Sequence, residues 1–278
     1  MTLFVFTGIV LLSSIGAGLV GALTGLGGGI VVTPVLTLML GVDIGYAIGA
    51  SLISVIATSS GAAAAYVRDG LSNVRVGIFL EVATTLGAIS GALISGKIPT
   101  TYLAILFGLV LLHSAWQASQ ARVEGGVVAD QGSLSRRLRL GGTYRAEGKE
   151  VEYVVSREGT GLSLMYVAGM LSGLLGIGSG ALKVIAMDRV MGLPFKVSTA
   201  TSSFMIGVTA VASATIYFKR GYILPQMAVP VMIGVLIGSM VGARLLPRLP
   251  VKTLRRIFAI VVGMIAIQMI VKGVRGTL

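Results

Sequence analysis

The chain has 278 residues, of which 55% are hydrophobic and 12% charged, with a formal net charge of +12. A soluble domain carries about 25% charged residues, so this composition indicates an all-α polytopic membrane protein. With no cysteine and a single histidine, disulfides, iron–sulfur clusters and the common zinc sites are excluded, and we expect no metal and no cofactor. Basic residues scattered between apolar segments are typical of cytoplasmic loops, so nucleic acid is not an expected partner.

About 8–10 hydrophobic segments follow along the chain, several of them near the length that crosses about 30 Å of hydrocarbon. In the first half they cover 3–24, 28–41, 45–66, 75–96 and 101–120. In the second half they cover 161–182, 184–192, 196–218, 224–246 and 256–272. The first segment has no basic residues before it, so we expect a retained span rather than a signal peptide.

A polar stretch separates two apolar halves. It divides the chain into an N-terminal transmembrane repeat (1–121), a cytoplasmic insert (122–157) and a C-terminal transmembrane repeat (158–278). Within the insert, alternating residues around a Glu-Gly dipeptide predict a small β-hairpin outside the bilayer. No catalytic constellation is visible there, so we expect a solvated linker.

The two halves resemble each other when the sequence is shifted by 151 residues without gaps. Matched landmarks are Gly27 and Gly178, Gly29 and Gly180, Ser51 and Ser202, Thr58 and Thr209, Tyr66 and Tyr217, and Pro99 and Pro250. With the N-terminus outside, sixteen of the 22 lysines and arginines fall on inside loops and five on outside loops. This bias favours that topology, which places the two glycine-rich segments on opposite sides and therefore predicts inverted repeats.

Both glycine-rich segments interrupt an apolar region, at "GLGGGIVVTP" (25–34) and "GIGSGALKVI" (176–185). Non-helical backbone survives inside a membrane only where protein or a watery cavity surrounds it. Paired interruptions at matching positions of two halves point to a transporter's binding site, and amides at a half-helix start attract anions. We therefore expect one broken helical hairpin per half and a small anionic substrate. The alternative is tight helix packing, which is all that we expect of Gly91 and Gly242.

These two segments resemble the sulfite exporter TauE/SafE family, whose hallmark is a doubled G-x-G-G-G segment followed by a proline-containing apolar stretch. The resemblance implies a multi-pass protein of the cytoplasmic membrane that moves a sulfur-containing anion, such as sulfite or a sulfonate. The second copy departs from the pattern: Ser179 replaces the middle glycine, and Ile185 stands where Pro34 stands in the first half. Lys183 lies inside the second motif.

The candidate substrate-binding residues gather at the two breaks and at the start of the span after each. They are Gly27, Gly28, Gly29, Pro34, Ser51, Gly178, Ser179, Gly180, Lys183, Thr201 and Ser202. Buried charges are costly in membranes and mark functional sites, so Lys183 suits an oxoanion. It could instead reach the cytoplasmic interface or pair with Asp188.

Two further titratable residues lie in the spans. Glu81 is a candidate carrier of a coupling proton, because burial of a carboxylate raises its proton affinity. The alternatives are pairing with Arg75 or a position near the lipid headgroups. His113 titrates near neutral pH, but a single histidine near a span end is more often simply packed.

A secondary transporter is the leading interpretation. No Walker motif is present, so ATP is not the direct energy source. An anion channel is the alternative, because paired half-helices can also line a pore. An intramembrane enzyme is less expected, since the spans contain no clear nucleophile–base pair.

Overall fold

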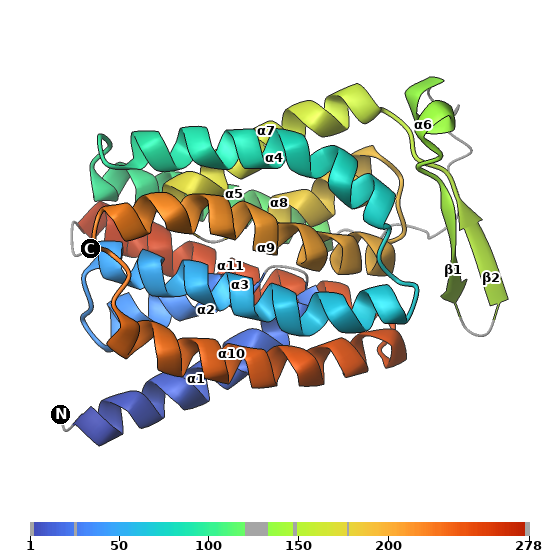
Figure 1. Cartoon of the computed structure of the whole chain (residues 1–278). Helices are drawn as coiled ribbons and strands as arrows, with labels where there is room; N and C mark the ends of the chain where they lie inside the picture. Colours follow the sequence, from blue (N-terminus) through green and yellow to red (C-terminus); the bar gives the residue numbers. More distant parts are fainter. Residues whose placement is uncertain (1–2, 25–26, 120–132, 147–148, 177, 276–278) are drawn as a thin grey trace.

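Long helices laid side by side form most of the molecule, and the two chain termini lie at the end opposite a projecting β-hairpin (Figure 1). This computed structural model describes residues 3–24, 27–119, 133–146, 149–176 and 178–275. Four of the described helices are long and apolar enough to cross a membrane: α3 (Ile44–Arg68), α4 (Val74–Ser95), α9 (Phe195–Lys219) and α10 (Pro225–Leu245). The expected all-α membrane class is therefore confirmed.

The remaining helices complete each half. The first half also has α1 (Leu3–Thr24), α2 (Gly29–Pro34) with a π-helical turn (Val35–Met39), and α5 (Thr100–Ser119). The second half also has α7 (Glu158–Leu175), α8 (Gly180–Ile185) with a π-helical turn (Ala186–Val190), a 3₁₀ turn (Leu246–Arg248) and α11 (Val251–Arg275). A shift of 151 residues carries the starts of α2, α3, α4 and α5 onto those of α8, α9, α10 and α11.

One predicted boundary is wrong. The segment expected over 161–182 ends as a helix at Leu175, and α8 begins at Gly180. The reason is the backbone between them, where Gly176 and Gly178 have φ values of 68° and 76°. These left-handed conformations suit glycine and cannot continue an α-helix. The following segment, expected at 184–192, therefore begins earlier.

Helices of one half pack on helices of the other through glycine. A Cβ atom added at Gly91 of α4 would lie 2.0 Å from the carbonyl oxygen of Met170 in α7. A Cβ atom added at Gly242 of α10 would lie 2.7 Å from the carbonyl oxygen of Leu19 in α1. Both glycines thus allow close backbone approach, as the sequence predicted.

The insert folds as α6 (Ser133–Leu138) followed by strands β1 (Gly142–Ala146) and β2 (Lys149–Tyr153), which pair antiparallel. The predicted hairpin is confirmed, and its Glu-Gly turn at 147–148 lies outside the described residues. In the register, Tyr144 stands opposite Val151.

The insert is not simply a solvated linker, and that expectation is wrong. Leu140, Tyr144 and Val155 are buried in one cluster with Met187 and Val197 of the bundle. Burial of these apolar side chains stabilises the packing of the insert against the helices. A polar contact adds to this packing, because Asn73 Nδ2 donates hydrogen bonds to the Leu140 carbonyl (2.8 Å) and the Tyr153 hydroxyl (2.9 Å).

Candidate functional site

The two helix breaks lie against the same pair of buried side chains. Gly27 and Gly178 have nearly equal positive φ values, 77° and 76°. A Cβ atom at Gly27 would lie 2.9 Å from Ile206 Cδ1 and 3.3 Å from Val55 Cγ2. At Gly178 it would lie 2.8 Å from Val55 Cγ1 and 3.5 Å from Ile206 Cβ. Only glycine fits this backbone at both places.

Two side chains of α3 form hydrogen bonds with the backbone of the first break. The amide of Gly28 donates to Thr58 Oγ1 at 3.2 Å. Ser51 Oγ lies 3.0 Å from the carbonyl oxygens of both Gly29 and Gly176, so it joins the two breaks. Ser51 therefore has a structural role in addition to the binding role that the sequence suggested.

Pro34 is buried inside the helical run, where α2 passes into its π-helical turn. Its ring removes a backbone donor, which suits the change of helical register there. The structure gives Pro34 this local role and does not place it among the polar groups of the site.

The second break is more strained. Ser179 adopts a left-handed conformation with a φ of 51°, and the residue is 4% exposed. Such a conformation is uncommon for serine and is a mark of functional sites. In the described part of the chain, Ser179 Oγ has no hydrogen-bond partner. Ser202 Oγ donates to the Gly180 carbonyl at 3.4 Å.

Thr201 contacts the start of α4. Its hydroxyl oxygen accepts a hydrogen bond of 2.9 Å from the backbone amide of Asn73, just before α4. The structure thus ties Thr201 to the α4 start rather than to the glycine-rich break.

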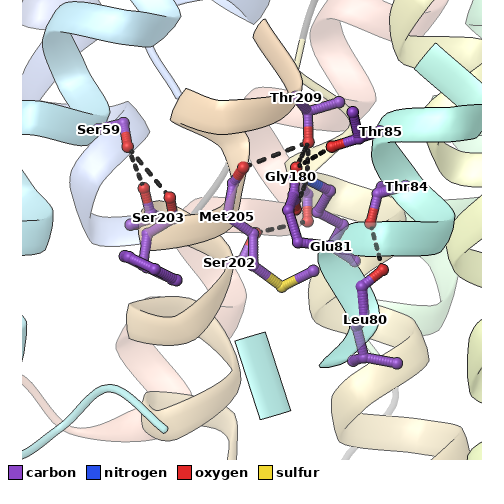
Figure 2. A network of polar contacts seen from close by, with 12 residues as sticks. Ser59, Leu80, Glu81, Thr84, Thr85, Gly180, Ser202, Ser203, Met205 and Thr209 are labelled. Carbon is purple, nitrogen blue, oxygen red and sulfur yellow. Dashed lines mark hydrogen bonds and ion pairs between the residues drawn. The ribbon is translucent and has the colours of Figure 1, made fainter. Parts of the chain in front are cut away.

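Lys183 and Glu81 form a buried ion pair. Lys183 Nζ lies 3.4 Å from Glu81 Oε2, and its side chain is 0% exposed. The same ammonium donates to Thr209 Oγ1 at 2.5 Å. The hydroxyls of Thr209 and Thr85 lie 2.5 Å and 3.1 Å from Glu81 Oε1, to which each donates. Figure 2 shows these oxygens converging from α4 and α9 beside the start of α8.

Both alternatives for Lys183 are wrong in this structure. A lysine that reached the interface would expose its ammonium, whereas this one is fully buried. Asp188 instead lies 3.7 Å from Arg189. The charge of Lys183 is therefore paired inside the protein, with Glu81.

Glu81 does not pair with Arg75 either. Arg75 is exposed and donates to the Arg139 carbonyl at 3.4 Å. His113 is exposed on α5, where its ring lies 6.0 Å from that of Trp116, centre to centre. The structure therefore keeps His113 apart from the buried pair.

Thr209 and Thr85 belong to the site, although the sequence did not mark them as site residues. Thr209 was visible only as a landmark of the repeat. Thr85 follows Glu81 by four positions, so it lies on the same helix face one turn further on. That spacing could have found Thr85 once Glu81 was suspected.

An apolar groove opens beside Glu81. It lies on the faces of α4 and α9 and has a volume of about 460 Å³. Glu81 and Thr85 are its polar members, and the other lining residues are Ile78, Val82, Leu86, Phe204 and Val208. Ile78 and Val82 are 59% and 63% exposed, as expected of side chains that face lipid. Among the described residues, no three histidine, aspartate or glutamate side chains gather as metal ligands.

Sequence comparison assigns the chain to a protein family. Residues 10–269 match the family described as Sulfite exporter TauE/SafE. The chain belongs to this family. It is 29% identical over 266 residues to the probable membrane transporter protein YunE of Bacillus subtilis (strain 168), covering 93% of this chain and 95% of the relative. It is 26% identical over 239 residues to YdhB of the same organism, described in the same words, covering 85% and 90%.

A third relative, from Xylella fastidiosa (strain 9a5c), is described as a probable membrane transporter protein. It is 27% identical over 268 residues, with 94% of this chain and 95% of the relative covered. No solved structure matches the chain. The TauE/SafE match includes both glycine-rich breaks and the buried pair, so the candidate site lies within the region that defines the family.

Proposed function

We propose that this TauE/SafE protein is a secondary transporter that moves a small sulfur-containing anion across the cytoplasmic membrane, with Lys183 as its main anion-binding group. One observation carries the proposal: a fully buried lysine beside a helix break of a membrane protein. The description of the family and those of three relatives as probable membrane transporters support it.

The energetics of the pair favour a functional role. Removing two charges from water costs several kcal/mol per ion, and replacing a buried pair by apolar residues is often neutral or stabilising. A pair that serves only stability therefore has little reason to persist inside a membrane protein. An anion that binds Lys183 gives the buried cation a use that no apolar residue can supply.

Other polar groups of the second break complete the proposed site. Ser179 lies four positions before Lys183, and its buried hydroxyl has no partner within the described residues. The amides around Gly178 and Gly180 are the further donors that we propose for an oxoanion. From the first break we propose Gly27, Gly28, Gly29 and Ser51 as the opposite wall of the path.

We also propose that the halves are inverted repeats related by a pseudo-two-fold axis in the membrane plane. The glycine contacts between halves support this, because Leu19 and Met170 are themselves separated by 151 residues. So does a matched pair of hydrogen bonds. The hydroxyl of Tyr66 donates to the Ala22 carbonyl at 2.8 Å, and Tyr217 donates to the equivalent Gly173 carbonyl at 3.3 Å.

A carrier fits the centre of the molecule better than a channel does. Val55 and Ile206 are 0% exposed and occupy the place where the two breaks meet. A channel needs a continuous polar path, and this apolar contact interrupts it. Counting the anions moved per second in liposomes distinguishes the two mechanisms.

A thermal-shift screen tests the proposed function. The purified protein is heated in detergent with sulfite, sulfate, thiosulfate or ethanesulfonate, because an anion that binds the folded state raises its melting temperature. We expect at least one of these anions to stabilise the wild type and to leave Lys183→Met unchanged. Equal shifts in both proteins, or no shift with any anion, would overturn the assignment.

The proposed topology has its own test, since a chain without cysteine allows single cysteines to be labelled cleanly. Lys97 and Thr143 are both exposed, the first between α4 and α5 and the second on β1. We expect a membrane-impermeant maleimide to label Lys97→Cys in intact cells and Thr143→Cys only after permeabilisation. The reverse pattern contradicts an outside N-terminus.

A further inference from the structure

Glu81 stands between a polar and an apolar environment. On one side its carboxylate meets Lys183 and Thr209, and on the other it meets Thr85 and the groove on α4 and α9. An ionised carboxylate is stable on the first side, where a cation compensates it. In an apolar groove only the neutral acid is tolerated, because an isolated buried charge is very costly.

We infer that a monovalent anion binds Lys183 by displacing Glu81, and that Glu81 takes up one proton as it leaves, so that one proton is bound with each anion. This inference rests on the proposed function, because it uses Lys183 as the anion site. It goes further by naming the co-substrate, the stoichiometry and the residue that holds the proton.

The charges balance in both forms of the site. Before binding, the Lys183 ammonium and the Glu81 carboxylate cancel. After binding, the anion cancels the ammonium, and a proton from water adds to Glu81 Oε2. Lys183 keeps its three protons, and no other bond forms or breaks. Without the proton the site would hold one uncompensated negative charge, which is strongly unfavourable when buried.

The structure provides a place for the displaced, neutral carboxyl group. Thr85 lies one helical turn beyond Glu81 and already donates a 3.1 Å hydrogen bond to Glu81 Oε1. The groove on that side has a volume of about 460 Å³, large enough for a carboxyl group to turn into. The carboxyl group can therefore leave Lys183 through a side-chain rotation while Thr85 still holds it.

Lys183 is the group placed to govern the protonation of Glu81. On α7, which packs against α4, Glu158 accepts from the Ser135 amide and Tyr166 donates to Ser90. On α9, Tyr217 donates to the Gly173 carbonyl, and Lys196 and Lys219 lie near the two helix ends. Arg75 of α4 is exposed. Within the described residues, Lys183 is the charged side chain in ion-pair contact with Glu81.

Calorimetry of ethanesulfonate binding in detergent tests the inference. Ethanesulfonate is the probe because its single charge is constant across the pH range used. Between about pH 8 and about pH 6 we expect the affinity to rise about tenfold per pH unit, which is the slope for one proton bound. Titrations in two buffers of different ionisation enthalpy should report about one proton taken up per anion.

Three variants locate the proton. In Glu81→Gln the pH dependence and the proton uptake should both disappear, whereas the control Glu150→Gln, an exposed residue of β2, should keep them. Thr85→Val keeps the ion pair and should weaken binding about two- to tenfold, as expected for one lost hydrogen bond, with the pH dependence retained. This variant and the wild-type proton count keep the test decisive if Glu81→Gln does not fold.

The outcomes separate this inference from the proposed function. Binding with constant affinity and no proton uptake overturns the exchange but leaves Lys183 as the anion site. Proton uptake that persists in Glu81→Gln overturns the assignment to Glu81. Absence of ethanesulfonate binding at both pH values overturns the inference, and the proposed function then depends on the sulfite, sulfate and thiosulfate arms of the screen.

Discussion

The two halves of the molecule share a frame but differ in the chemistry at the break. Both have a left-handed glycine at the matching position and a short helix that passes into a π-helical turn. At the second break, Lys183 pairs with the buried carboxylate of Glu81, which α4 of the first half contributes, and both contact Thr209. At the first break, the residues equivalent to the two charged ones are apolar. The matched positions are Lys183 and Val32, Glu81 and Met232, and Thr209 and Thr58.

This difference shows what the fold itself requires. Val32 is 3% exposed, so an apolar side chain fills that place in the first half without any charge. The charges at the second break are therefore an addition to the frame rather than a condition for it. The variants below either remove the difference in charge between the two breaks or test whether the two halves share a frame.

Breaking the pair one residue at a time should have the largest effect. Glu81→Met alone leaves Lys183 buried and unpaired, which should lower the free energy of unfolding by about 3–5 kcal/mol. The double variant Glu81→Met/Lys183→Val copies the apolar residues equivalent to the pair at the first break. It should return close to wild-type stability, because apolar replacement of a buried pair is often neutral. Chemical unfolding in detergent measures both values.

A double variant as unstable as the single one would contradict this view. It would mean that the structure around the second break needs its charges to fold. The reciprocal change, Val32→Lys, is the matched control. It should destabilise the first break, because the equivalent of Glu81 there is the apolar Met232 of α10.

The equivalent threonines should differ in their effect. Thr209→Val removes the hydroxyl that both charged groups contact, and a hydrogen bond to a charged group contributes about 1.5–3 kcal/mol. Thr58→Val removes a neutral contact to the Gly28 amide, which contributes about 0.5–1.5 kcal/mol. Unfolding of the two variants side by side should show the larger loss for Thr209→Val. Equal losses would argue that the pair gains nothing from its threonine.

The frame, in contrast, should respond alike in both halves. A Cβ atom at Gly91 or Gly242 would meet backbone of the opposing helix, so each change to alanine should cost about 1–3 kcal/mol through overpacking. Gly8→Ala is the control, because nothing lies within 4 Å of its added Cβ atom. Similar decreases in melting temperature for the two variants in detergent, with unchanged anion affinity, would support a shared frame. A loss confined to one half would not.

The sequence predicted the frame better than the site. Glycine and proline landmarks repeat at a fixed spacing, so they predicted the matched helix starts and the helix breaks at Gly27 and Gly178. The partner of Lys183 could not be read from them, because Glu81 lies 102 residues away and on another helix. Nearby Asp188 and Arg75 were the natural guesses, and the tertiary packing of α4, α8 and α9 overrules both.

The insert illustrates the same limit. Its alternating pattern predicted the strands, since the period of two is local. Its polar composition suggested a solvated linker, but three apolar side chains decide its place against the helices. Such contacts between distant segments are invisible to composition.

Anion affinity of the Lys183 variants tests the central claim most directly. The anion that stabilises the wild type most in the thermal-shift screen is titrated by calorimetry into wild type, Lys183→Met, Lys183→Arg and the charge-free double variant. A charge-assisted contact of about 1.5–3 kcal/mol predicts binding about 10- to 150-fold weaker in Lys183→Met and in the double variant. Lys183→Arg should recover only part of it, because guanidinium is larger and planar. Wild-type affinity in the folded double variant would contradict the account, since the anion would then bind without the buried lysine.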